Sequence, residues 1–270
     1  MTAMRYARTL YACWSAALAA EAEYRLNFAA AAVIALFTLV GSLLVLAIFY
    51  GPDTGADATI LGGWTYYEAL CVTAVYTLLD GFQQTFLQPN RQQLTEMVRE
   101  GQLDFVLIKP IDPQFWLSTN RLAIFGVPNL VFGGVLLAFA MSQLDALPSG
   151  FAVALGLSAI VVGMAIVYAL GFLLATLTIW FVKMDNITLA MNALLEAGRY
   201  PIPAYAPAYR VFFTFVLPVA FMTTVPAATL TGRDAPGWTL AIAFGIAAAM
   251  VLGSRLLLRF ALRFYTSASS

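Results

Sequence analysis

FAAAAVIALFTLVGSLLVLAIFY (Phe28–Tyr50) is the stretch that decides the fold class of this chain. It contains no charged side chain, and roughly 20 apolar residues suffice for a helix to cross the hydrocarbon core of a bilayer. A helix also satisfies its own backbone hydrogen bonds in lipid, where water cannot. The stretch therefore predicts a membrane-spanning helix.

The composition of the whole chain agrees with that stretch. Of its 270 residues, 61% are hydrophobic and only 10% are charged, and the mean hydropathy is +0.83. Soluble domains carry about 25% charged residues. The chain cannot bury so much apolar surface in a core of its own, so we expect a bilayer to surround it. The net charge is zero, which indicates neither an acidic nor a nucleic-acid partner.

We expect an all-α membrane protein with six transmembrane helices, forming one domain over residues 1–270. The fifth span is ambiguous because prolines and Glu196 interrupt it. Either Ile187–Gly198 is a broken first half of this span, or Val211–Leu230 is the span and Ile187–Gly198 lies at the surface. The predicted spans are 28–50, 64–86, 122–141, 151–181, about 187–230, and 238–258.

Basic residues predict the orientation, because short cytoplasmic loops are enriched in Lys and Arg. The opposite loops, Gly51–Asp57 and Ser142–Gly150, contain none. Both termini are therefore expected to be cytoplasmic. Eleven of the fourteen basic residues fall on the predicted cytoplasmic side: Arg5, Arg8, Arg25, Arg91, Arg99, Lys109, Arg121, Lys183, Arg255, Arg259 and Arg263.

The N-terminal segment, residues 1–26, is predicted to be an interfacial helix. Tyr6, Leu10, Trp14 and Leu18 recur every four residues, while Arg8 lies off that line. Two interpretations stay open. The helix is a simple membrane anchor, or it packs beside the segment described next and helps to transmit its motion.

NRQQLTEMVREGQLDFVLIKPIDPQFW (Asn90–Trp116) is the only long charge-dense amphipathic stretch between spans, and we call it the lever segment. It begins with an i, i+3, i+4 apolar stripe, and Gly101 then favours a helix stop. An apolar run follows, and Pro110 and Pro113 predict a rigid turn into the third span. The lever segment is either a cytoplasmic handle for a water-soluble partner or an ordinary amphipathic loop on the membrane surface.

The chain lacks the residues that catalysis and nucleotide binding need. Its two lysines, Lys109 and Lys183, do not stand in GxxxxGK[ST], so no Walker-type ATP site is expected. There is no histidine for acid–base chemistry or for a transition metal, and no GxSxG elbow. We therefore predict that the chain is not an enzyme and holds neither a metal nor a cofactor of its own.

Two carboxylates within the predicted second span suggest a different function. Glu68 and Asp80 are twelve residues apart and share roughly one helix face. Carboxylates inside a membrane are costly and are candidates for proton or cation sites. The other interpretation is that each reaches water or a neighbouring hydroxyl. A proton- or ion-coupled transporter or channel using Glu68 and Asp80 is thus the alternative function, and a non-transporting scaffold is a third.

Two motifs resemble those of a known family. Glu100-Gly101-Gln102-Leu103-Asp104 through Leu107-Ile108-Lys109-Pro110-Ile111 resembles E-G-x-L-D-x-x-L-x-[KR]-P. The second motif, Tyr200-Pro201, then Phe215-Val216-Leu217-Pro218-Val219-Ala220-Phe221, then Val225-Pro226-Ala227, resembles YP…F-x-x-P-V-A-F…PA. Both are typical of the permease subunits of ABC-2 type exporters, and the bacterial group listed as a domain of unknown function (DUF990) is the most similar branch.

The resemblance implies a complex of two permeases and two ABC ATPase subunits in the bacterial cytoplasmic (inner) membrane. ATP and Mg would bind to the ATPases, and the second permease would be another copy or a homologue. The loop between spans two and three would be the coupling helix that docks on the nucleotide-binding domain. Short re-entrant helices on the outer side would precede the sixth span. The pattern is least clear over Asn186–Tyr209.

The exporter hypothesis assigns roles to particular residues. Apolar spans suit a hydrophobic or amphiphilic substrate, although a polymer exporter would look similar. The path candidates are aromatics in spans two and five, although an aromatic on a buried span more often packs than contacts substrate: Tyr76, Phe82, Phe215 and Phe221. A docking surface needs apolar contacts with a charged rim, and we assign that role to Leu94, Met97, Val98, Arg99, Glu100, Leu103 and Asp104.

Overall fold

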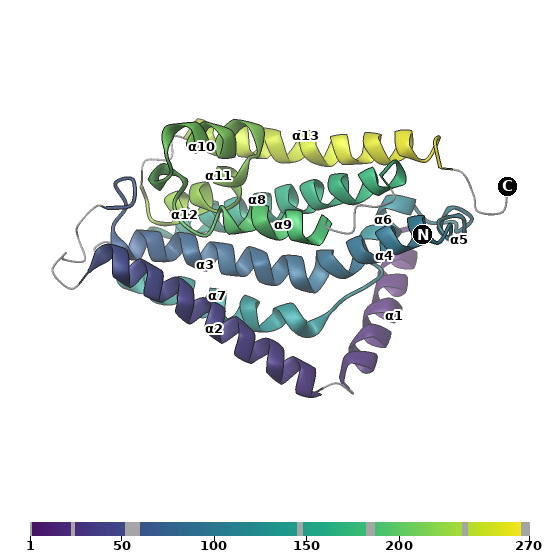
Figure 1. The fold of residues 1–270 in the computed structure, drawn as a ribbon, viewed down its shortest axis with the longest axis horizontal. Coiled ribbons are helices and arrows are strands. Elements are labelled where there is room, and N and C mark those ends of the chain that lie inside the picture. Colours follow the sequence, from purple (N-terminus) through teal and green to yellow (C-terminus); the bar gives the residue numbers. More distant parts are fainter. Residues whose placement is uncertain are drawn as a thin grey trace.

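The computed structural model describes residues 2–22, 25–51, 60–144, 148–181, 187–233 and 237–265, and within these ranges the regular elements are helices without a strand. A bundle of long helices runs roughly along the long axis of the molecule (Figure 1). They are α2 (Arg25–Tyr50), α3 (Tyr66–Phe82), α7 (Val127–Ser142), α8 (Gly150–Thr176) and α13 (Gly237–Ala261). The all-α prediction is confirmed.

Shorter helices lie at the two ends of this bundle (Figure 1). One end, which we call the lever end, holds α4 (Gln88–Arg99), α5 (Asp104–Leu107) and α6 (Pro113–Thr119). The first turn of α1 (Thr2–Ala22) and the last turn of α13 also lie there, and α1 is steeply inclined to the bundle. The opposite end holds α10 (Pro207–Val211), α11 (Val219–Met222) and α12 (Thr224–Leu230).

Four helices among the described residues are long and apolar enough to cross a membrane, or five if one bent pair counts as a span. The four are Arg25–Tyr50, Ile124–Ser142, Gly150–Ile179 and Gly237–Ala261. The region of the predicted second span, 64–86, is occupied by α3, which has 17 residues and continues into a π-helical turn, η1 (Gln83–Leu87). Six crossings therefore stay a prediction.

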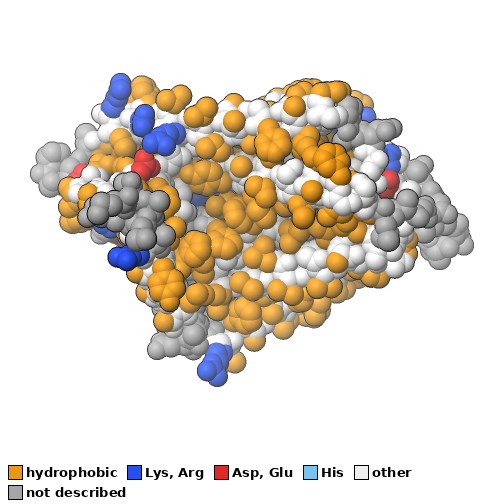
Figure 2. Space-filling view, turned by 180° about the vertical axis from the view of Figure 1, so that it is seen from behind, with side chains coloured by type: hydrophobic (Ala, Val, Ile, Leu, Met, Phe, Trp, Pro, Cys, Tyr) orange, Lys and Arg blue, Asp and Glu red, His pale blue; other side chains and the backbone are white. Residues whose placement is uncertain are grey.

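The surface of the bundle is suited to lipid along its middle. Figure 2 shows a broad band of hydrophobic side chains, while Lys, Arg, Asp and Glu gather toward the two ends. Large apolar side chains such as Phe37, Ile48, Val135 and Leu256 are exposed on the long helices. Exposing such a continuous apolar area to water would be unfavourable, so this band fits a membrane environment.

Close backbone contact holds α3 against α7. A Cβ added to Gly81 would lie 2.6 Å from the Leu130 nitrogen, and one added to Gly133 would lie 2.8 Å from the Leu78 nitrogen. Small residues let membrane helices approach closely, which supplies the packing that lipid does not provide. The main core lies around this contact and includes the fully buried Leu79.

The ambiguous fifth region is divided into several short helices. Met191 and Leu195 of α9 (Ile187–Glu196) are fully buried in the main core, which does not fit the interpretation that places Ile187–Gly198 at the surface. The run Val211–Leu230 is not one continuous helix, because Pro207–Val216 and Val219–Leu230 are bent by 69°. Pro218 lies at that break and lacks the N–H that a continuous helix would use.

Candidate functional site

The lever segment is joined to α3 without a break. Gln83 and Gln88, which follow α3 and η1, both have helical backbone angles, and the Gln88 N–H bonds to the Gln83 carbonyl. Pro89 stands in the first turn of α4. Its ring would clash with the carbonyl four residues earlier in an ideal helix, and the wider π turn relieves that clash. The backbone of α3, η1 and α4 is therefore continuously helical.

A second apolar core, which we call the lever cluster, packs the lever segment onto the bundle. Leu94, Leu103 and Leu117 are fully buried in it. They meet Phe172 of α8 and Leu258 of α13. The sequence predicted the apolar stripe, but only the fold reveals which helices cover it.

Gly101 ends α4 as the sequence predicted. Its φ is +67°, and the following Gln102 N–H donates to the Met97 carbonyl over 2.8 Å. This left-handed conformation strains residues that carry a Cβ, so glycine suits it. The turn reverses the chain into α5.

Polar contacts fix α6 to the bundle. The Asp112 carboxylate accepts a hydrogen bond from the Phe115 N–H over 3.0 Å and lies 3.0 Å from the Arg255 guanidinium of α13. The Gln114 amide donates to the hydroxyls of Ser254 and Tyr168, each over 3.0 Å. The lever segment is thus fixed at both of its ends.

The predicted docking residues divide into two groups. Arg99 and Glu100 are exposed and Asp104 is half-buried at the lever end, while Met97 and Val98 pack half-buried against the lever cluster. Leu94 and Leu103 are fully buried, which does not fit direct contact with a partner.

Two other apolar side chains of the lever segment are exposed and can offer the contact with a partner that was predicted for those leucines. Phe105 is 64% exposed and Ile108 is 79% exposed. They stand three residues apart, on the opposite side of α5 from the buried Val106. The sequence contained a signal for this difference. A helical repeat of 3.6 residues, applied to the apolar run, places these two side chains on a different face from the buried Val106. We call Arg99, Glu100, Phe105 and Ile108 the tip.

The N-terminal helix packs beside the lever segment. The Trp14 indole N–H donates to the Thr119 carbonyl over 2.8 Å, and the Tyr6 and Phe115 rings meet edge to face at 4.7 Å. The Tyr6 hydroxyl accepts a hydrogen bond from the Asp112 N–H over 3.3 Å. The interpretation that α1 packs beside the lever is confirmed, and its role in transmitting motion stays a prediction.

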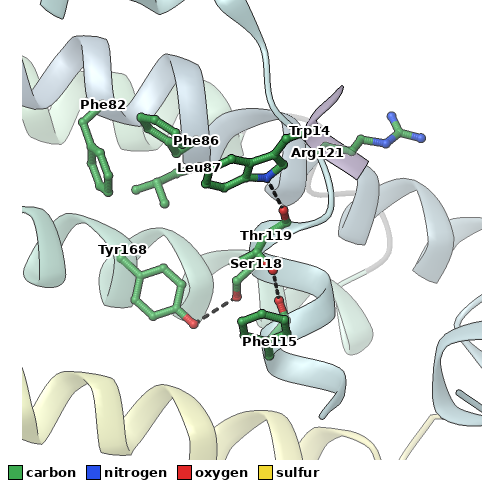
Figure 3. Close-up of a pocket in the computed structure, with 9 residues that line it drawn as sticks. All are labelled: Trp14, Phe82, Phe86, Leu87, Phe115, Ser118, Thr119, Arg121 and Tyr168. Atoms are coloured by element: carbon green, nitrogen blue, oxygen red, sulfur yellow. Dashed lines mark hydrogen bonds between the residues drawn. The ribbon is translucent and has the colours of Figure 1, made fainter. Parts of the chain in front are cut away.

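A cavity of about 400 Å³ lies where α1, η1, α6 and α8 meet, and we call it the aromatic cavity. Figure 3 shows Phe82, Phe86 and Trp14 along one side, with Tyr168 and Phe115 opposite, while the Arg121 guanidinium points away. The Tyr168 hydroxyl bonds to the Ser118 hydroxyl at 3.0 Å. Phe82 is thus the one path candidate found here.

A second apolar space of about 470 Å³ runs between α8, α13 and the bent pair, and we call it the lateral groove. Phe215 and Phe221, two further path candidates, line it together with Trp238. Phe215 is exposed, whereas Phe221 is buried. Because the bent pair lies at the end of the bundle opposite the lever end, part of the groove lies there too.

Tyr76, the remaining path candidate, belongs to a polar network that is buried except at Glu196. Its hydroxyl accepts a hydrogen bond from the Arg199 guanidinium over 3.0 Å and contacts the Glu196 carboxylate at 3.3 Å. Arg199 also donates to the Ser42 hydroxyl of α2 over 3.0 Å. The network joins α2 and α3 to the end of α9. The hydroxyl of Tyr76 is therefore used in contacts within the protein, with Arg199 and Glu196. The four path candidates thus lie in three separate places: the aromatic cavity, the lateral groove and this polar network.

Glu68 and Asp80 have separate partners. Glu68 forms a capping box with Thr65 and lies 2.6 Å from the Arg233 guanidinium. Asp80 accepts hydrogen bonds from the amides of Gln84 and Asn129, over 2.7 and 3.0 Å. Twelve helical residues separate the two carboxylates by roughly 18 Å. The geometry does not bring them into one ion site.

Comparison with known proteins gives one match. A family model described as "ABC-2 family transporter protein" matches residues 36–269. No curated protein and no solved structure matches the chain.

Proposed function

The chain belongs to the ABC-2 family of transporter proteins, and on this premise we propose that it is the transmembrane permease of an exporter driven by separate ATPase subunits. It is a multi-pass membrane protein of that family. Two ATPases would bind ATP and Mg, and two permeases, as identical copies or homologues, would form the path. The bacterial inner membrane is the proposed location.

We propose that the lever end faces the cytoplasm. Cytoplasmic segments of membrane proteins are enriched in Lys and Arg. The segments at the lever end carry several such residues: Arg8, Arg99, Lys109 and Arg255. Three parts of the sequence argument, residues 52–57, residues 145–147 and Lys183, lie outside the described residues. Six crossings follow if α3 with η1 counts as one span and α9 belongs to a broken fifth span. The bent pair then forms the outer re-entrant helices.

The observation that carries this proposal is the continuous connection from the tip through α4 and η1 into α3. A docking surface has to offer apolar contact within a charged rim, and Phe105 and Ile108 beside Arg99 and Glu100 provide it. Leu94 and Leu103 then act behind the surface, holding the tip to the bundle. Nucleotide-driven closure of two ATPases would push the tip and thereby shift α3 against α7.

The substrate class that the interior supports is hydrophobic or amphiphilic. The lateral groove and the aromatic cavity are both lined mostly by apolar side chains. An ion-coupled mechanism gains no specific support, because Glu68 and Asp80 each have local partners.

Co-purification with a companion ABC ATPase tests the proposal. The wild-type permease in mild detergent is expected to bring down the ATPase. Phe105→Glu with Ile108→Glu is expected to abolish that association and the ATP-driven uptake of substrate into inverted vesicles. Gln92→Glu is the matched control, because it adds a negative charge at an exposed position of α4 away from the tip.

Two results would contradict the proposal. The first is an ATPase complex that survives the double substitution. The second is a purified chain that moves substrate without any companion ATPase.

A further inference from the structure

The last turns of α13 expose a cluster of aromatic rings at the lever end. The ring centroids of Phe260 and Phe264 lie 4.9 Å apart, and the ring of Trp180, which follows α8, lies 6.0 Å from each of them. Phe260 is 50% exposed and Phe264 is 54% exposed, so the rings contact one another without being covered by the rest of the described chain. Exposed apolar clusters of this kind are typical of contact surfaces.

Arg259 and Arg263 stand beside these rings, since each directly precedes one of the two phenylalanines, and both are exposed. Neither is paired with a carboxylate of the described residues, whereas Arg255, one turn earlier, is paired with Asp112. Like charges four residues apart repel each other on a helix, and the carbonyl end of α13 supplies only about half an elementary negative charge. An anion from outside the chain would balance the remaining charge. We call Trp180, Arg259, Phe260, Arg263 and Phe264 the aromatic–basic patch.

The aromatic–basic patch lies at a depth that matches one boundary of a bilayer. Trp238 is 64% exposed in the first turn of α13, at the other end of the helix. Phe260 follows 22 residues later, which is roughly 33 Å at the helical rise of 1.5 Å. The hydrocarbon core of a bilayer is about 30 Å thick, and aromatic side chains are enriched at both of its boundaries. The patch therefore fits the level of the lipid head groups.

The exposed apolar surface of α13 leads directly into the patch. Leu252 and Leu256, which are 61% and 65% exposed, precede Phe260 and Phe264 at the same four-residue spacing. Side chains at this spacing form one row along a helix. The row belongs to the apolar band that fits a membrane, and the arginines stand where the row reaches the polar end of the molecule (Figure 2). Acyl chains of a lipid therefore fit this row.

We propose that the aromatic–basic patch binds an anionic phospholipid. The phosphate accepts hydrogen bonds from the guanidinium groups of Arg259 and Arg263, and an acyl chain lies along the row through Phe260 and Leu256. Hydrogen bonds between a guanidinium and a phosphate are charge-assisted and therefore strong, and basic side chains near a membrane surface attract anionic lipids. A water-soluble protein would cover the arginines but not the row that continues into the hydrocarbon core.

This binding does not depend on the proposed exporter function. Only the assignment to the inner leaflet rests on the proposed orientation, in which the lever end faces the cytoplasm. A permease that failed to bind an ATPase at the tip would still bind the lipid, and a permease without the lipid site would still have its tip. The two proposals therefore fail separately.

Native mass spectrometry of the full chain in a neutral detergent tests the proposal. The probes are dioleoyl phosphatidylglycerol, which is anionic, and dioleoyl phosphatidylethanolamine, which has the same chains and no net charge. We expect wild type to bind the anionic lipid at least about tenfold more tightly, because each basic residue near the head group contributes about fivefold. Arg259→Gln with Arg263→Gln is expected to remove this preference. The proposal is overturned if this variant, shown to be folded by its melting temperature, keeps the preference.

Two further variants show whether the patch itself is responsible. Arg8→Gln with Arg121→Gln removes the same charge from two exposed positions outside the patch on the predicted cytoplasmic side, and it is expected to keep the preference. Phe260→Ala with Phe264→Ala removes the rings and is expected to weaken the binding of both lipids. A control that loses the preference as fully as the patch variant would overturn the proposal, as would unchanged affinity for both lipids in the alanine variant.

A protein partner is the competing occupant of this surface. Co-purification with a companion ABC ATPase separates the two occupants, because the tip is intact in Arg259→Gln with Arg263→Gln. The ATPase is expected to stay bound to this variant. Loss of the ATPase together with an unchanged lipid preference would assign the patch to a protein and overturn the lipid site.

Discussion

The Arg233 guanidinium lies 2.6 Å from the carboxylate of Glu68, although 165 residues separate them in the chain. Arg233 also donates to the Gly63 carbonyl and stacks on the Trp64 ring, at 5.0 Å from its centroid. This pair lies at the end of the bundle opposite the lever. It fixes the entry to α3 against the segment that precedes α13.

Glu68→Gln is therefore expected to lower stability and to leave transport intact. Removing the charge from this partly buried pair should reduce the free energy of unfolding by about 1–2 kcal/mol. The melting temperature in detergent should fall by a few degrees, measured by differential scanning fluorimetry. ATP-driven transport into inverted vesicles should continue.

Asp80→Asn provides the companion experiment. Asparagine keeps an oxygen that can accept from Gln84 and Asn129, so transport should again continue. Loss of transport in both variants, with the ATPase still bound, would favour the ion-coupled alternative over the exporter.

Gly133→Ala is expected to disrupt the contact between α3 and α7. The added Cβ would lie 2.8 Å from the Leu78 backbone nitrogen, so one of the helices must shift. Overpacking of this kind costs about 1–3 kcal/mol. The matched control is Gly134→Ala, since nothing lies within 4 Å of the position of its Cβ. Thermal unfolding of both variants measures the difference, and equal melting temperatures would contradict the close contact.

Arg91→Met is expected to maintain or raise stability at neutral pH. Burial lowers the pKa of Arg91 to about 10, below its ordinary value, so the unfolded chain binds the proton more tightly. Keeping the charge buried therefore costs up to about 3 kcal/mol at neutral pH, and this cost falls as the pH rises above 10. The gain in melting temperature over wild type should shrink between pH 7.5 and 10.5. A clear loss of stability at pH 7.5 would mean that Arg91 has a structural partner.

Gly101→Ala is expected to loosen the turn that places the tip. Alanine in the left-handed conformation at φ +67° costs about 1–2 kcal/mol, whereas Gly101→Asn should cost less. Because the turn sets the position of α5 relative to α4, the alanine variant should stimulate the bound ATPase less. The measurement is ATP hydrolysis by the purified complex, with Gly134→Ala as the control. Unchanged stimulation in the alanine variant would show that the turn is not needed for coupling.

The lever segment shows how far sequence reasoning reaches. Its glycine stop could be predicted because glycine has a conformational property that does not depend on distant residues. The contacts of Leu94 and Leu103 could not be predicted, because a stripe of leucines can pack equally well against a partner protein or against other helices of the same chain. The burial of both leucines against Phe172 and Leu258 depends on α8 and α13.

The fifth region shows a different limit. Prolines predicted an interruption, and the 69° bend beside Pro218 follows from the missing N–H. Whether Ile187–Gly198 enters the bundle depends on what its apolar side chains can pack against. Met191 and Leu195 find that packing in the main core, which includes residues of α3 and α8.

The sequence by itself determined the all-helical class, the approximate positions of the long helices and the glycine stop. These follow from local properties: hydropathy over one helix length and backbone conformation at single residues. Only the tertiary structure decided that the lever is continuous with α3, that Glu68 pairs with Arg233, and that Arg91 is left buried beside an apolar cavity. Those features depend on which distant residues meet, since a buried charge or leucine acquires its role from the neighbours that exclude water around it.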